Sequence, residues 1–165
     1  MKTIKLIGLF IIIGIFSSCD KGDELAPIPE NNPTGNYNYT GHSKYFHSTG
    51  TLDYQTDISG SANIQYGPSG NTIDIYVIPM IGYEYQIKGT NLKQHGDTTT
   101  FSIGRQQEII LGRTFTFEGT NGVPVGNLGN YDGYFTTKSF HLQYHSVNIT
   151  DLTTTDTYID ASKRN

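Results

Sequence analysis

Residues 139–145 read Ser139-Phe140-His141-Leu142-Gln143-Tyr144-His145, in which polar and apolar side chains alternate strictly. Successive side chains of a β-strand point to opposite faces, so an alternation of period two indicates a strand with one face in water. The same alternation occurs over 71–78, 83–88 and 114–118. These segments predict an all-β fold.

The composition agrees with strands along the rest of the chain. The sequence contains 12 tyrosines, 8 phenylalanines and 19 glycines but no tryptophan, and aromatic and β-branched residues favour strands. Turn signals such as Gly67-Pro68 and Gly96-Asp97 separate the alternating runs. The longest predicted loop covers 121–130. The predicted strands are 36–47, 52–66, 71–79, 83–89, 97–103, 107–111, 113–118, 131–147 and 152–161.

Strands that follow one another through short turns predict an antiparallel meander. Such a sheet must hide its edges, and a closed or nearly closed barrel of about 8–10 strands does so. A two-sheet β-sandwich is the alternative. The local connections favour the barrel.

The alternation also predicts which side chains face inward. Phe115 and Phe117 are two residues apart and should face the interior together, with Thr116 pointing outward. Large aromatic residues recur on inward faces, which favours a filled interior over an open cavity, since small barrels are easily filled. If a ligand were bound inside, its candidate contacts would be Tyr85, Phe115, Phe117 and Phe140, with Ile87 and Leu142 beside them.

Other tyrosines occupy predicted strand ends beside glycine and asparagine: Tyr37, Tyr39, Tyr131 and Tyr134. Tyrosine combines a large ring with a hydrogen-bonding tip, which suits contacts with proteins and sugars. We take Tyr131 and Tyr134 as candidate partner contacts.

No residue pattern indicates catalysis, a metal or a cofactor. His141 and His145 share a strand face but lie about 13 Å apart at roughly 3.3 Å per residue, too far for one ion. Asp53 and Asp57 have the same spacing, which is wide for a glycosidase pair. The sequence therefore predicts a non-enzymatic protein without a cofactor or metal, and a hydrolase is the weakest alternative.

The N-terminus carries a targeting signal. Lys2 and Lys5 precede an apolar run over 6–16, and Ser17-Ser18-Cys19 follows. The run is too short to span a bilayer, which needs roughly 20 apolar residues. Cys19, the only cysteine, has no disulfide partner in the chain. The segment resembles a bacterial lipoprotein signal, and the resemblance implies that 1–18 are removed and that Cys19 becomes the lipidated first residue.

The segment 19–35 should be an extended tether, because Pro27, Pro29 and Pro33 fix the backbone and remove amide donors. Its acidic start resembles the signal that exports lipoproteins of Bacteroidota to the surface of the outer membrane. In that signal a lysine directly precedes two acidic residues, whereas here Gly22 lies between them. The sequence therefore does not decide between the cell surface and the periplasmic face of the outer membrane. Asp97-Thr98-Thr99 resembles the O-glycosylation triplet of the same bacteria, with Thr98 as acceptor.

The remainder predicts one β domain over 36–161 and a short tail over 162–165. The formal net charge of −4 becomes more negative when Lys2 and Lys5 leave, which argues against a nucleic-acid partner. The signal, the meander and the opening strand Gly35-Asn36-Tyr37-Asn38-Tyr39-Thr40-Gly41 resemble small calycin-like or lipocalin-like outer-membrane lipoproteins of Bacteroidota. This resemblance implies an anchored binding or accessory protein that acts through protein contacts, with an outer-membrane protein complex as its candidate partner. The alternative is a carrier of a small apolar ligand or glycan.

Overall fold

The computed structural model describes residues 31–79 and 83–165; the signal, Cys19 and the start of the tether lie outside the described residues. The described chain is all-β, with one short 3-10 turn, η1 (Gly126–Leu128). The strands are β1 (Gly35–Phe46), β2 (Leu52–Tyr66), β3 (Ile73–Pro79), β4 (Tyr85–His95), β5 (Thr98–Ile103), β6 (Gln106–Ile110), β7 (Arg113–Gly119), β8 (Val123–Pro124), β9 (Asn130–Tyr131), β10 (Gly133–Phe135), β11 (Ser139–Asn148) and β12 (Thr154–Lys163).

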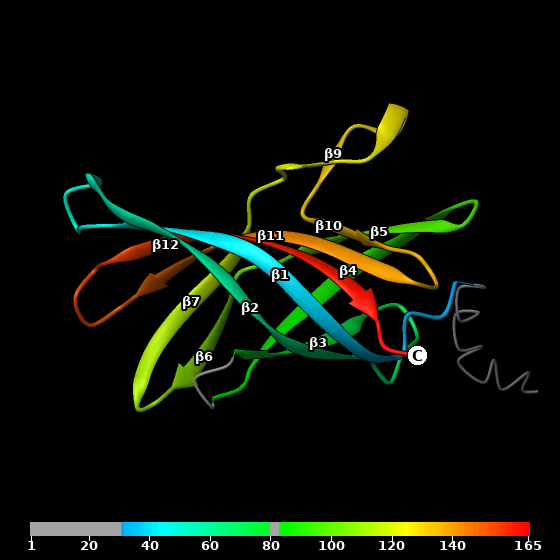
Figure 1. The fold of residues 1–165 in the computed structure, drawn as a ribbon, viewed down its shortest axis with the longest axis horizontal. Coiled ribbons are helices and arrows are strands. Elements are labelled where there is room, and N and C mark those ends of the chain that lie inside the picture. The colour runs from blue at the N-terminus through cyan, green and yellow to red at the C-terminus, as the bar shows by residue number, and fades with distance from the viewer. Residues whose placement is uncertain (1–30, 80–82) are drawn as a thin grey trace, which may run out of the picture.

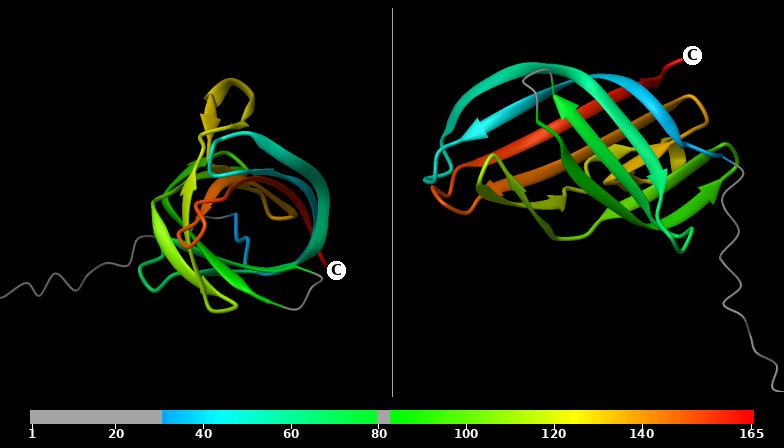
Figure 2. Two further views of the ribbon diagram at one scale, coloured as in Figure 1. Left: turned by 90° about the vertical axis from the view of Figure 1, so that its left-hand side faces the viewer. Right: turned by 90° about the horizontal axis from the view of Figure 1, so that it is seen from below.

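Eight of these strands form a hydrogen-bonded ring, which confirms the predicted barrel and not the sandwich. The order is β10-β5-β4-β3-β2-β1-β12-β11, and pairing between β10 and β11 completes the ring (Figures 1 and 2). All of these pairings are antiparallel. The first and last long strands, β1 and β12, are neighbours.

β11 divides the barrel into two ends, because it has different partners along its length. Its first half pairs with β10, where Phe140 lies opposite Phe135. Its second half pairs with β7, where Ser146 lies opposite Phe117. The ring is thus complete at the closed end, where the described chain begins at Asn31. At the other end, which we call the cavity end, the β6–β7 hairpin replaces β5 and β10.

The closed end holds the hydrophobic core. Along β11 every second residue is buried, as the alternation predicts. Apolar side chains from seven other ring strands meet those of β11, and each fully buried one contributes roughly 1.5–3 kcal/mol. The largest fully buried side chains include Tyr37, Ile64, Ile75, Ile87, Phe101, Phe135, Phe140, Leu142 and Ile159.

The single strand predicted over 131–147 is wrong. The structure breaks it into β9, β10 and β11, with a turn at 136–138. The Thr136 hydroxyl accepts hydrogen bonds from the backbone N–H groups of Lys138 and Ser139, at 3.2 and 3.1 Å, and so reverses the chain. Before β10, the carboxylate of Asp132 accepts hydrogen bonds from the N–H groups of Ile103 and Asn121, at 2.7 and 2.6 Å.

Two of the tyrosines at predicted strand ends belong to the interior. Tyr37 and Tyr39 both point into the barrel and are 0% and 3% exposed. The expectation that Thr116 faces water is wrong. Thr116 lies between Val147 of β11 and Gln107 of β6 in the ladder and is 4% exposed, so β7 is buried on both faces at Thr116 and Phe117.

Candidate functional site

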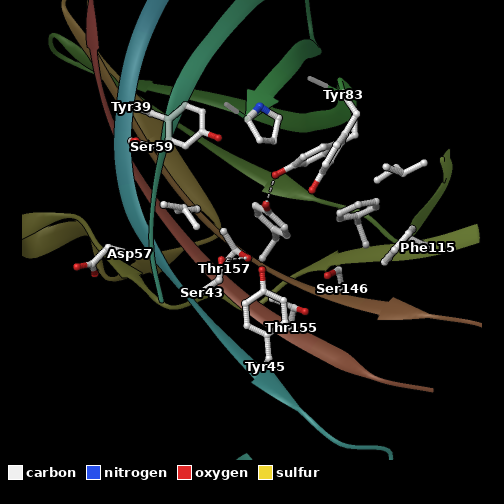
Figure 3. Close-up of a pocket in the computed structure, with 16 residues that line it drawn as sticks. Tyr39, Ser43, Tyr45, Asp57, Ser59, Tyr83, Phe115, Ser146, Thr155 and Thr157 are labelled. Carbon is white, nitrogen blue, oxygen red and sulfur yellow. Dashed lines mark hydrogen bonds between the residues drawn. The ribbon is translucent and has the colours of Figure 1, made fainter. Parts of the chain in front are cut away.

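The barrel contains a cavity of about 440 Å³ at the cavity end. Its lining comes from eight strands: β1, β2, β3, β4, β6, β7, β11 and β12 (Figure 3). The sequence predicts a filled interior, and the cavity shows that this is true of only one end. Inward aromatic residues fill the closed end. At the cavity end, where β6 and β7 take the place of β5 and β10, the interior stays open.

Five tyrosines dominate the lining: Tyr39, Tyr45, Tyr83, Tyr85 and Tyr144. The ring of Tyr85 stacks on that of Phe117, with 5.5 Å between centroids and 9° between planes. Phe117 also packs against Tyr144 at 5.6 Å. These three rings separate the cavity from the core. The apolar part of the wall is completed by Ile58, Pro79, Ile110 and Phe115.

Hydroxyl groups line the opposite side. The hydroxyls of Ser43 and Thr157 hydrogen bond at 3.0 Å, which joins β1 to β12 (Figure 3). Thr157 also hydrogen bonds to the hydroxyl of Tyr144, which in turn lies 2.5 Å from that of Tyr85. The cavity therefore has one aromatic wall and one chain of hydroxyls. Further polar side chains at its edge are Asp57, Ser59, Ser146 and Thr155.

The tyrosine hydroxyls are neutral at any physiological pH. Burial raises the pKa of Tyr39 to about 12, and the nearby Tyr83 adds to the shift. Burial likewise raises the pKa of Tyr85 and of Tyr144 well above the ordinary value. Each of these hydroxyls can therefore donate and accept a hydrogen bond, and none carries a charge.

The lining is poor in charge. Among the described residues that border the cavity, Asp57 is the only one with a charged side chain, and it is exposed at the edge. No histidine or cysteine stands beside the lining serines and threonines there. Apart from Asp57, the lining therefore consists of apolar side chains and neutral hydroxyl groups.

The structure brings together three of the four residues predicted as ligand contacts. Tyr85, Phe115 and Phe117 line the cavity. Phe140 does not: it is fully buried in the core and packs edge-on against Tyr37, with 5.1 Å between ring centroids. Ile87 and Leu142 are also in the core. The sequence analysis missed the hydroxyl side of the cavity, although Ser43 and Tyr45 alternate in the same register as Tyr39.

The other predicted sites lie away from the cavity. Tyr134 projects from the outer face of β10 and stacks on His141 at 4.4 Å. Tyr131 is in β9, and its ring lies 6.5 Å from that of His95. Thr98 is the first residue of β5 and is half-buried rather than on an open turn. Cys19 is outside the described residues.

The histidines of β11 have partners that the sequence analysis did not identify. The Nδ1 atom of His141 hydrogen bonds to the carboxylate of Asp160 on β12. His145 does the same with Asp156, at 2.6 Å between Nδ1 and Oδ1. Each pair is directly opposite in the ladder. These are cross-strand pairs on the outer face, and no cluster of three potential metal ligands occurs in residues 31–79 and 83–165.

No helix within the described ranges has the length and apolar character needed to cross a membrane. Neither a protein-family model nor a curated protein sequence matches the chain. A crystal structure from Bacteroides ovatus, of a protein described as being of unknown function, matches with a TM-score of 0.41 and 16% sequence identity. The match covers 79% of this chain and 41% of that chain, so this chain spans about two fifths of the other protein's length.

Proposed function

We propose that the protein is a lipid-anchored, non-enzymatic binding protein of the bacterial outer membrane that holds a small neutral molecule in its barrel. The observation that carries this proposal is the cavity of about 440 Å³ lined by five tyrosines. Small-molecule sites usually measure roughly 300–1,000 Å³ and combine apolar walls with a few placed polar groups. The anchor in this proposal is Cys19, in the lipoprotein-like signal.

The chemistry of the lining indicates the class of ligand. A flat or apolar body would lie against the aromatic wall that includes Tyr85 and Phe115, and hydroxyl or carbonyl groups would face Ser43 and Thr157. A charged ligand would lose its hydration without gaining a partner of opposite charge inside the cavity, which is unfavourable. A neutral amphipathic molecule fits best, and a sugar with an apolar face belongs to this class.

Native mass spectrometry of the protein extracted from membranes tests the proposal. We expect a small molecule to remain bound, and Phe115→Trp to prevent its retention by filling the cavity. Tyr134→Phe, on the outer face, is the matched control and should retain the molecule. Absence of any bound molecule, combined with unchanged binding of a library of neutral compounds by wild type and Phe115→Trp, would contradict the proposal.

A second candidate function is contact with another protein of an outer-membrane complex through the outer face. The observation that favours it is the aromatic stack of Tyr134 on His141, beside the stacked pair His42 and Tyr158. Under this alternative, Tyr134→Ala together with Tyr131→Ala would lose the partner in a pull-down with a purified candidate, whereas Phe115→Trp would not.

A further inference from the structure

A group of large apolar side chains is exposed around the opening of the cavity. We call it the mouth rim, and it consists of Leu52, Tyr54, Ile109, Leu111, Ile149 and Leu152. These side chains are 44–79% exposed, and Leu128 is the one other exposed large hydrophobic residue among those described. Exposed apolar residues scattered singly need no explanation, but a group on one feature does.

The mouth rim comes from three hairpins whose turns all lie at the cavity end. They are the β1–β2, β6–β7 and β11–β12 hairpins, which extend to the left in Figure 1. Each is next to a residue that lines the cavity. Tyr54 stacks on Tyr45 at 4.4 Å, and Leu111 follows Ile110. The β11–β12 turn is held against β7 by a hydrogen bond from Ile149 N–H to Thr114 C=O.

Two rim leucines have backbone conformations that disfavour leucine. Leu111 has φ of 50° and Leu152 has φ of 59°. Because Ile110 pairs with Arg113, Leu111 and Gly112 form a two-residue hairpin turn with positive φ at both positions, for which Asn-Gly is preferred. The other two non-glycine residues with positive φ among those described are Asn91 and Asn121, the usual choice.

Folding does not explain these leucines. Their backbone conformation favours asparagine or glycine, and their side chains are 79% and 58% exposed, so they contribute little to the core. Both lie beside the cavity opening. A contact outside the domain, with an apolar phase, accounts for leucine at both positions.

We propose that the mouth rim inserts into the surface of a lipid bilayer. Protein interfaces depend mainly on Trp, Tyr and Arg in one well-packed patch, and leucine is under-represented among their dominant residues. The rim instead presents aliphatic side chains on three separate turns, an arrangement that a fluid partner can accommodate. Tyr54 is the one aromatic member, and tyrosine is favoured at the boundary between hydrocarbon and headgroups.

The charged groups near the rim favour a zwitterionic surface. The His47 ring lies 3.3 Å from the Asp53 carboxylate, and Arg113 lies 4.0 Å from Asp151. These contacts do not form a basic patch that would attract anionic lipid. Insertion would depend on burial of the apolar side chains and should change little with salt.

The tether is long enough for the anchored protein to reach its own bilayer with the mouth rim. Residues 19–30 span at most about 40 Å when extended. They join the closed end at Asn31, whose side-chain amide donates a hydrogen bond to Gly96 C=O. β2 has 15 residues and is about 50 Å long, and because barrel strands are tilted the barrel is about 35–40 Å high. The extended tether is therefore as long as the barrel is high.

With the mouth rim in the bilayer, the cavity would open toward the lipid, so a ligand could enter without crossing water. This inference rests on the proposed lipid anchor at Cys19 and is independent of what occupies the cavity.

Because the chain contains no tryptophan, a single introduced tryptophan reports on its surroundings. Leu111→Trp and Tyr54→Trp place one in the mouth rim, and Tyr54 is at an ordinary strand position, so it serves if Leu111→Trp does not fold. Lys138→Trp, in the β10–β11 turn at the closed end, is the control. The lipidated protein is reconstituted into phosphatidylcholine vesicles with brominated acyl chains.

We expect emission of the rim tryptophans to shift to shorter wavelength and to be quenched at least twofold by brominated lipid, with no quenching at position 138. Adding Leu52→Asn and Leu152→Asn should remove the quenching, whereas adding Leu128→Asn should not. Equal quenching at both ends, or none at the rim, would overturn the proposal. A blue shift without quenching would also overturn it, because the rim would then be buried against protein.

Discussion

The hydroxyl oxygens of Tyr85 and Tyr144 lie 2.5 Å apart and form a hydrogen bond between β4 and β11, which are not neighbours in the sheet. The bond crosses the interior of the barrel and forms the boundary between the core and the cavity. Tyr144 also hydrogen bonds to Thr157, so the crossing is linked to the hydroxyl groups of Thr157 and Ser43.

Removing either hydroxyl alone should lower the free energy of unfolding by more than half of the loss caused by removing both. Tyr144→Phe leaves the Tyr85 hydroxyl without this partner, and Tyr85→Phe removes one of the two partners of the Tyr144 hydroxyl. Loss of a partner from a buried hydroxyl destabilises by about 1–3 kcal/mol. The double variant removes both groups, so its loss should be smaller than the sum of the single losses. Urea unfolding of the four proteins measures the cycle. Additive losses would show that the hydrogen bond contributes no coupling.

The stability of the barrel should fall at alkaline pH. Burial raises the pKa of Tyr37 and of Tyr39 from 10 in the unfolded chain to about 12. The folded state therefore binds protons more tightly, and its stabilisation is complete below pH 10 and is lost as the pH rises toward 12. Urea midpoints across this range test the prediction. In Tyr39→Phe the decline should be shallower, whereas an unchanged slope would exclude Tyr39 as a contributor.

Phenylalanines at the two ends of the barrel should differ in their contribution to stability. Phe140→Ala leaves a void in the closed core and should cost about 3–5 kcal/mol. Phe115 is half-buried beside an existing cavity, and Phe115→Ala should cost clearly less. Equal losses in the free energy of unfolding would mean that the cavity is filled in solution.

Thr116→Val should be neutral or stabilising. The Thr116 hydroxyl is buried without a hydrogen-bond partner among the described residues, and valine replaces it at nearly the same volume. Thr116→Ala should instead destabilise through lost packing. A marked loss in the valine variant would reveal a hydrogen bond to the hydroxyl, such as one from a buried water molecule.

Cys19→Ala should release the protein from membranes or leave the precursor uncleaved, because the proposed lipid attachment is at this cysteine. Membrane fractionation followed by mass spectrometry of the N-terminus measures both outcomes. A wild-type protein that begins at another residue and carries no lipid would contradict the proposed anchor.

Periodicity predicts the face of a residue but not its height along the barrel. Tyr85, Phe117 and Phe140 are all inward, as their alternation predicts, yet Phe140 is in the core and the other two line the cavity. The height depends on the stagger between strands, which is set by long-range pairing such as Phe140 with Phe135. Alternation also does not reveal the turn at Thr136. In the sequence, a threonine whose hydroxyl accepts hydrogen bonds from nearby N–H groups looks the same as a threonine in a strand.

The pairing of β1 with β12 affects the order in which the chain folds. Ten residue pairs, from Tyr37 with Lys163 to Phe46 with Thr154, join the beginning of the domain to its end. A chain that emerges N-terminus first exposes the outer edge of β1 until the final strand arrives, and unpaired edges promote association with other chains. Such distant contacts also slow folding. Folding of this barrel should therefore be sensitive to C-terminal truncation and to a chaperone that shields the open edge.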